Sequence, residues 1–151
     1  MLTAGPLPRI AGPDGAERIV LAVDVSNWLR PDAGTSAERA FCHTYPRGRG
    51  QAQMIPGWPY WVVAALGSGA TSWTALLDVV RLHPDDDATA VTAGQLRDVI
   101  ENLARAGLHR PEDPAILVVA DAGYDVLTTC ALHHSMGHYF RPTHPHTLRR
   151  R

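Results

Sequence analysis

Two aspartates lie within or directly after the most apolar stretches of the chain. Asp24 is near the end of the run IVLAVDV (19–25), and Asp121 follows the run AILVVA (115–120). A carboxylate in apolar surroundings is costly unless it is paired, hydrogen-bonded or bound to a metal ion. If the two runs are neighbouring strands, the carboxylates converge and a divalent cation removes their repulsion. Because Mg²⁺ prefers oxygen ligands, the pair predicts a metal-dependent phosphoryl-transfer site.

Each aspartate also has a purely structural interpretation. An aspartate at the end of a strand often shapes a turn or caps a helix, and Asp121 precedes Ala-Gly, a sequence that suits a turn. Spacing alone therefore leaves both interpretations open.

The elements that would position these residues are mostly strands. The runs are short, apolar and rich in β-branched residues, and they are bounded by Gly, Pro and polar residues. We predict strands over 19–25, 58–66, 72–82 and 115–120, with a shorter one over 41–45. The segment 72–82 is compatible with a helix as well, but the Gly-rich turn before it favours a hairpin with 58–66.

One helix is predicted over residues 92–106. Its apolar residues recur at helical spacing, with Thr92 as the N-cap, Gln95 completing a capping box and Gly107 ending the helix. The acidic run 85–87 ahead of it is expected to be a solvated loop, where negative charge is favourable beside a helix N-terminus. The expected order is strand, strand, strand, helix, strand, which is an α/β class.

Composition sets the broad class of protein. The chain has 151 residues, 45% of them hydrophobic, and a formal net charge of -1, so charge alone does not indicate a nucleic-acid-binding protein. All 14 basic residues are Arg. The two cysteines, Cys42 and Cys130, form no CxxC motif, and no segment predicts a signal peptide or a membrane span. We expect a single domain in the reducing cytoplasm.

Three polar residues between the predicted strands 41–45 and 58–66 are candidates for contacts with DNA. Arg47, Arg49 and Gln53 lie in a Gly-containing segment, and an Arg side chain binds phosphate oxygens with two parallel hydrogen bonds. An ordinary solvated loop explains the same residues equally well.

Aromatic residues are concentrated near the predicted hairpin. Trp58, Tyr60, Trp61 and Trp73 have the flat rings that stack nucleobases. Their aliphatic neighbours favour core packing over base stacking.

The last segment of the chain changes character. Residues 132–151 contain five of the eight histidines and no acid, and we expect them to pack poorly. Cys130, His133, His134 and His138 are residue types that bind zinc, but their spacing fits no standard zinc finger.

Three longer motifs resemble a known family. LAVDVSNWLRPD (21–32), FCHTYPRGRGQAQMIPGWPYWVVAAL (41–66) and ILVVADAGYD (116–125) are similar, in this order, to the catalytic domain of bacterial insertion-sequence transposases of the DDE class. The resemblance implies a ribonuclease H-like fold that binds Mg²⁺ or Mn²⁺ and acts on DNA at element ends and target. It also implies that Asp24 is the first catalytic acid and Asp121 the second.

The resemblance covers residues 19–126 as a partial catalytic domain, between an irregular lead-in (1–18) and a divergent tail (127–151). The family has a third acid, a Glu further downstream, whereas the last Glu of this sequence is Glu112. Because this third acid is missing, the expectation is an inactive transposase fragment with little or no strand transfer, in the cytoplasm or associated with the nucleoid.

Two alternatives stay open at this point. The first is a non-catalytic remnant that binds DNA or an intact transposase subunit. The second is a small ribonuclease H-like nuclease, for which Asp32 and Asp125 are the nearest further carboxylates.

Overall fold

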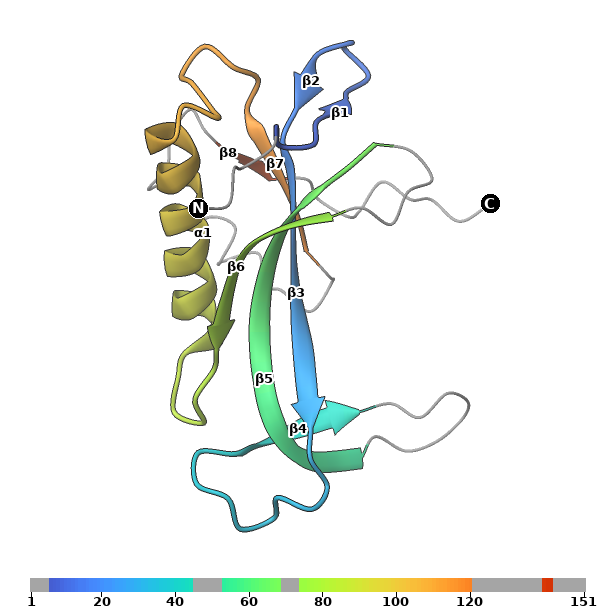
Figure 1. Ribbon diagram of the computed structural model, residues 1–151, viewed down its shortest axis with the longest axis vertical. Helices are drawn as coiled ribbons and strands as arrows, with labels where there is room; N and C mark the ends of the chain where they lie inside the picture. Colours follow the sequence, from blue (N-terminus) through green and yellow to red (C-terminus); the bar gives the residue numbers. More distant parts are fainter. Residues whose placement is uncertain (1–5, 45–52, 69–73, 121–139, 143–151) are drawn as a thin grey trace, which may run out of the picture.

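A computed structural model describes residues 6–44, 53–68, 74–120 and 140–142. Its main element is a six-stranded mixed sheet with the strand order β4-β5-β3-β7-β8, to which β6 adds by pairing with β5. A single helix, α1, lies along this sheet beside β6 (Figure 1). This mixed α/β arrangement is consistent with a ribonuclease H-like fold and confirms the predicted class.

The five strands from 20–29 to 116–120 follow the predicted order along the chain, whereas three short strands lie in the lead-in (1–18) and the tail (127–151), where none was predicted. The bounds of the strands in the sheet are β3 Val20–Leu29, β4 Ala40–Thr44, β5 Gln53–Leu66, β6 Thr74–Arg81, β7 Ile116–Ala120 and β8 Phe140–Pro142, and α1 Ala88–Arg105 lies between β6 and β7. Ahead of β3, the two-residue strands β1 (Ile10–Ala11) and β2 (Glu17–Arg18) form a short antiparallel pair.

The central strand β3 has one antiparallel and one parallel neighbour in the sheet. It pairs antiparallel with β5, from Leu21 opposite Ala65 to Leu29 opposite Gly57, without a shift in register. On its other edge it pairs parallel with β7, from Val20 beside Leu117 to Val23 beside Ala120. Because side chains alternate along a strand, this register decides which residues of all three strands share a face.

The core lies between α1 and one face of the sheet. Leu21 and Val23 of β3, Val63 of β5 and Ile116 of β7 are all buried on this face. The helix contributes an apolar stripe of Leu96, Val99, Ile100 and Leu103. These residues recur at i, i+3, i+4 and i+7, the spacing that places them on one side of a helix.

The start of the helix differs from the prediction. The capping box at Thr92 and Gln95 is wrong, because α1 begins at Ala88 with Asp87 as its N-cap. Thr92 is buried inside the helix, and its hydroxyl donates to the Ala88 carbonyl at 2.7 Å. Gln95 donates instead to the Trp61 carbonyl of β5 at 3.2 Å. The predicted end is confirmed, since Gly107 has a φ of 71° directly after the last turn.

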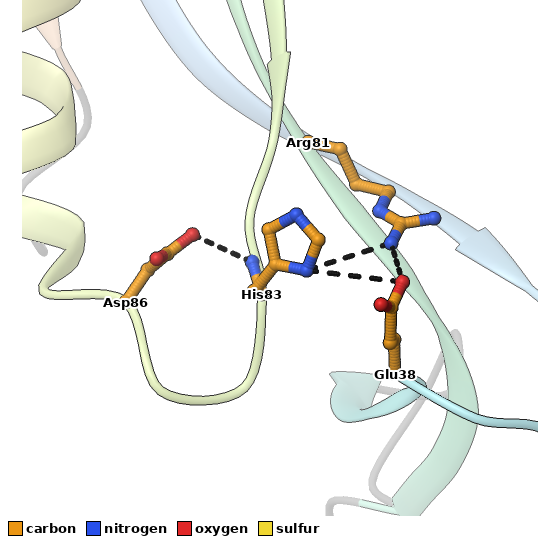
Figure 2. A network of polar contacts seen from close by, with 4 residues as sticks. All are labelled: Glu38, Arg81, His83 and Asp86. Carbon is orange, nitrogen blue, oxygen red and sulfur yellow. Dashed lines mark hydrogen bonds and ion pairs between the residues drawn. The ribbon is translucent and has the colours of Figure 1, made fainter.

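A network of polar contacts ties the loop after β3 to the corner between β6 and α1 (Figure 2). Arg81, the last residue of β6, pairs with Glu38, whose φ of 56° is unusual for a residue with a side chain. His83 Nδ1 lies 3.5 Å from the Arg81 guanidinium, and the His83 amide donates to Asp86 at 2.8 Å. The network links two segments that are far apart in the sequence, the loop that contains Glu38 and residues 81–86.

Replacing Asp87 by Ala should lower the free energy of unfolding by about 1 kcal/mol, because the amides of Thr89 and Ala90 lose their acceptor. Urea titration followed by circular dichroism measures the change. Asp85→Ala, at a neighbouring exposed acid, is the control and should change stability by less than about 0.5 kcal/mol. Equal losses in the two variants would contradict the assignment of Asp87 as the cap.

Replacing Gly57 by Ala should destabilise the sheet where β3, β4 and β5 meet. A Cβ at this position would lie 2.6 Å from the Trp28 carbonyl oxygen, so the backbone must shift, at a cost of about 1–3 kcal/mol. Gly94→Ala is the matched control, because nothing lies within 4 Å of its Cβ position and Ala favours a helix by about 0.5–1 kcal/mol. Thermal unfolding should therefore show opposite shifts, and a neutral Gly57→Ala would refute the close approach.

The stability of the protein should decrease as the pH falls below about 6.5, the ordinary pKa of histidine. His109 is 3% exposed, and burial lowers its pKa although the nearby Asp113 carboxylate opposes the shift. The unfolded chain therefore takes up this proton first, which favours unfolding. His109→Gln should flatten the decrease between pH 7.5 and 5.5, measured as the free energy of unfolding in urea. An unchanged slope would contradict the role of His109.

Candidate active site

Asp24 lies on the face of the sheet that points away from α1. Leu21 and Val23 face the core, so the alternating positions Ala22 and Asp24 belong to the opposite face. The prediction that apolar residues enclose the Asp24 carboxylate is wrong, because this residue is exposed. The predicted strand ended at Val25, but β3 continues to Leu29 with its outer face open.

The Asp24 carboxylate is available for a ligand. Its Oδ1 accepts a hydrogen bond from the Val25 amide at 2.8 Å, and its neighbour across β5 is the apolar Val62. Among the described residues no Arg or His forms an ion pair with it. An exposed, unpaired carboxylate of this kind is a suitable oxygen ligand for a hard cation.

The register of β3 and β7 relates Asp24 to the predicted second acid. The last described pair is Val23 beside Ala120, and Asp24 and Asp121 directly follow these two residues in the sequence. Asp121 itself lies outside the described residues. On the same outer face, Val119 of β7 pairs with Ala22 and is 42% exposed.

Gln53, the predicted DNA contact that lies within the described residues, is not close to Asp24. Gln53 is the first residue of β5, where it pairs with Thr44 of β4, and it is exposed. It lies nine positions along β5 from Val62, the partner of Asp24, which corresponds to roughly 30 Å of extended strand. Arg47 and Arg49 lie outside the described residues.

Further acidic residues do not complete a cluster around Asp24 within the part of the chain that the structure describes. There, no group of three or more His, Cys, Asp or Glu side chains is arranged to hold a metal ion. Asp32 lies beyond the end of β3, where its carboxylate accepts two hydrogen bonds from the Arg30 guanidinium, at 3.1 and 2.9 Å. This hydrogen-bonded guanidinium lowers the pKa of Asp32. Asp125 and the histidine-rich set at 130–138 lie outside the described residues.

The aromatic residues divide between the two faces of the sheet. Trp61 packs against the core, as the sequence analysis favoured, whereas Trp58 and Tyr60 contact Trp28 on the outer face. Trp73 lies outside the described residues. Trp28 was not a predicted site residue, because the predicted strand ended at Val25. Residues 25–29 (VSNWL) show no regular alternation of polar and apolar types that would signal the longer strand.

Within the described segments there is no helix of the length and apolar character needed to cross a bilayer.

Comparison with known proteins identifies the family. A family model described as DDE superfamily endonuclease matches residues 2–133, which is most of the chain. No curated protein and no solved structure matches it. The match includes both predicted acids and every strand from β1 to β7. The chain therefore belongs to the DDE superfamily endonucleases.

Proposed function

We propose that this protein carries a catalytic domain of the bacterial insertion-sequence transposase type, that it binds Mg²⁺ or Mn²⁺ through Asp24 and Asp121, and that it has little or no activity on DNA by itself. The observation that carries the proposal is the parallel pairing of Val23 with Ala120, because Asp24 and Asp121 are the next residues on the two strands. If the pairing continues by one residue, both carboxylates lie on the outer face, at neighbouring strands about 4.8 Å apart.

The donor chemistry fits a divalent cation. Asp24 contributes carboxylate oxygens from an exposed position, and Asp121 would add oxygens of the same kind. When bound, the ion would lower the pKa of an attacking water and neutralise charge on the phosphate. The two strands would hold the carboxylates at a fixed separation, since each acid follows a residue whose backbone belongs to the sheet.

The third acid of the family is the point at which this sequence departs from the pattern. No Glu follows Glu112, and Asp125 is the only acid after Asp121. Two carboxylates can hold one metal ion more readily than a pair of metal ions. We therefore propose that this chain binds metal weakly and, by itself, carries out little or no strand transfer. DNA at element ends and target sites is the proposed substrate.

Metal binding should depend on both acids. Asp24→Asn and Asp121→Asn should each weaken Mn²⁺ binding by more than about tenfold, the loss that even supporting residues of a metal site cause. Isothermal titration calorimetry of the whole chain measures this, with Asp98→Asn, at an exposed acid of α1, as the control. Equal binding by all three variants and the wild type would refute the assignment.

A plasmid assay distinguishes cleavage from strand transfer. With Mn²⁺, the wild-type chain alone should nick supercoiled DNA little more than Asp24→Asn does, and it should form no joined products. Joined products from purified wild-type protein would contradict the proposed effect of the missing third acid.

A further inference from the structure

Three aromatic side chains form a cluster on the outer face of the sheet. Trp28 of β3 lies opposite Trp58 of β5, with ring centroids 5.9 Å apart and an interplanar angle of 55°. Tyr60 is the diagonal neighbour, at 6.5 Å and 39° from Trp28. Tilted rings at these distances are a favourable aromatic packing, so each ring helps to fix the others.

The cluster shares its face with Asp24. Asp24, Ser26 and Trp28 are alternate residues of β3, and their partners Val62, Tyr60 and Trp58 are alternate residues of β5. The register between the two strands has no shift over this length, so no bulge turns a side chain to the other face. Trp28 is four positions from Asp24, about 13 Å along the strand. That spans about four base-pair steps of DNA.

Trp28 is 56% exposed although it is the largest apolar side chain type. Trp58 and Tyr60 are partly buried, so they support Trp28 while it presents its ring to the surroundings. An exposed aromatic residue with packed aromatic neighbours is typical of a binding surface rather than of a core.

The backbone below Trp28 is rigidly held. Gly57 lies against it so closely that an added Cβ would be 2.6 Å from the Trp28 carbonyl oxygen. Two residues later, the Arg30 amide donates to the Pro56 carbonyl at 2.8 Å. The ring is therefore presented by paired strands and not by a loop, which limits the entropy lost when a ligand binds.

Two of the described arginines at this end of the sheet are already paired with acids, while a third, Arg39, donates to the Ser36 carbonyl at 2.9 Å and lies over the Phe41 ring. Arg30 is bound to Asp32, and Arg81, which pairs in register with Tyr60, is bound to Glu38 (Figure 2). Their charge is thus largely compensated, which weakens attraction for the phosphates of a duplex. The cluster instead presents the face of an aromatic ring, on which any nucleobase can stack.

We propose that Trp28, supported by Trp58 and Tyr60, stacks an unpaired nucleobase a few nucleotides from the phosphate that lies near Asp24. This inference rests on the proposed function, because it takes DNA as the ligand. It adds that the DNA is bound with at least one base unpaired, and that Trp28 is the residue that selects this form.

Fluorescence anisotropy of a labelled single-stranded oligonucleotide, titrated with the whole chain in EDTA, tests the proposal. Trp28→Ala should weaken single-strand binding by about 5- to 100-fold, the range expected for one lost base stack. A duplex of the same sequence should bind more weakly than the single strand and be little affected. Leu76→Ala, at a residue that is 63% exposed on the same face, is the control and should bind like the wild type.

A second variant separates stacking from folding. Trp28→Phe keeps an aromatic ring, so it should retain the fold and most of the affinity, while the quenching of tryptophan fluorescence by the oligonucleotide should decrease. Undiminished quenching in Trp28→Phe would overturn the proposal. So would wild-type affinity in Trp28→Ala, an equal loss for single strand and duplex, or no single-strand binding by the wild type.

Because EDTA removes divalent metal ions, the binding assay tests base stacking at Trp28 independently of metal binding at Asp24. Loss of the Asp24 metal site would leave binding in EDTA unchanged, whereas failure of stacking at Trp28 would leave Mn²⁺ binding unchanged. Each result therefore contradicts only one of the two.

Discussion

The placement of β3 between β5 and β7 is the constraint on which the rest of the structure depends. One face of β3 provides Leu21 and Val23 to the core under α1, and burial of that face fixes the register of both neighbouring strands. The same register places Asp24 and Trp28 on the outer face. A shift by one residue would exchange the two faces, so the packing of the core and the position of the site have a common cause.

Much of this arrangement could be predicted from the sequence, because the strands are apolar and differ clearly from the segments between them. β4, β6 and β7 lie close to the predicted strands, whereas β5 begins at Gln53, five residues before the predicted start and within a segment that was expected to be a loop. The start of α1 could not be predicted in the same way, since Asp87 is the last of three consecutive acids and Thr92 has the sequence of a good cap. Burial of Thr92 against the sheet, a tertiary effect, decides between them.

The sequence names Asp24 as a candidate from its place in an apolar run, but it does not predict the environment of its side chain. Asp24 is exposed because it lies on the face of β3 opposite the core, and that depends on how the sheet packs against α1. The pairing of Asp32 with Arg30, and of Arg81 with Glu38, likewise depends on side-chain geometry. Trp28 could not be predicted in this way, because Ser26 and Asn27 interrupt the apolar run and the end of β3 is held by pairing with β5.

The central claim is that Asp24 and Asp121 lie side by side, and a disulfide between them tests it most directly. Asp24→Cys and Asp121→Cys would be combined in a chain in which Cys42 and Cys130 are replaced by Ala. Neighbouring strands bring Cα atoms within the range of about 4.4–6.8 Å that a disulfide requires. The account predicts an intramolecular disulfide on mild oxidation, detected by mass spectrometry of the digested protein. Its absence, or equally efficient formation between Asp24→Cys and Asp125→Cys, would contradict the account.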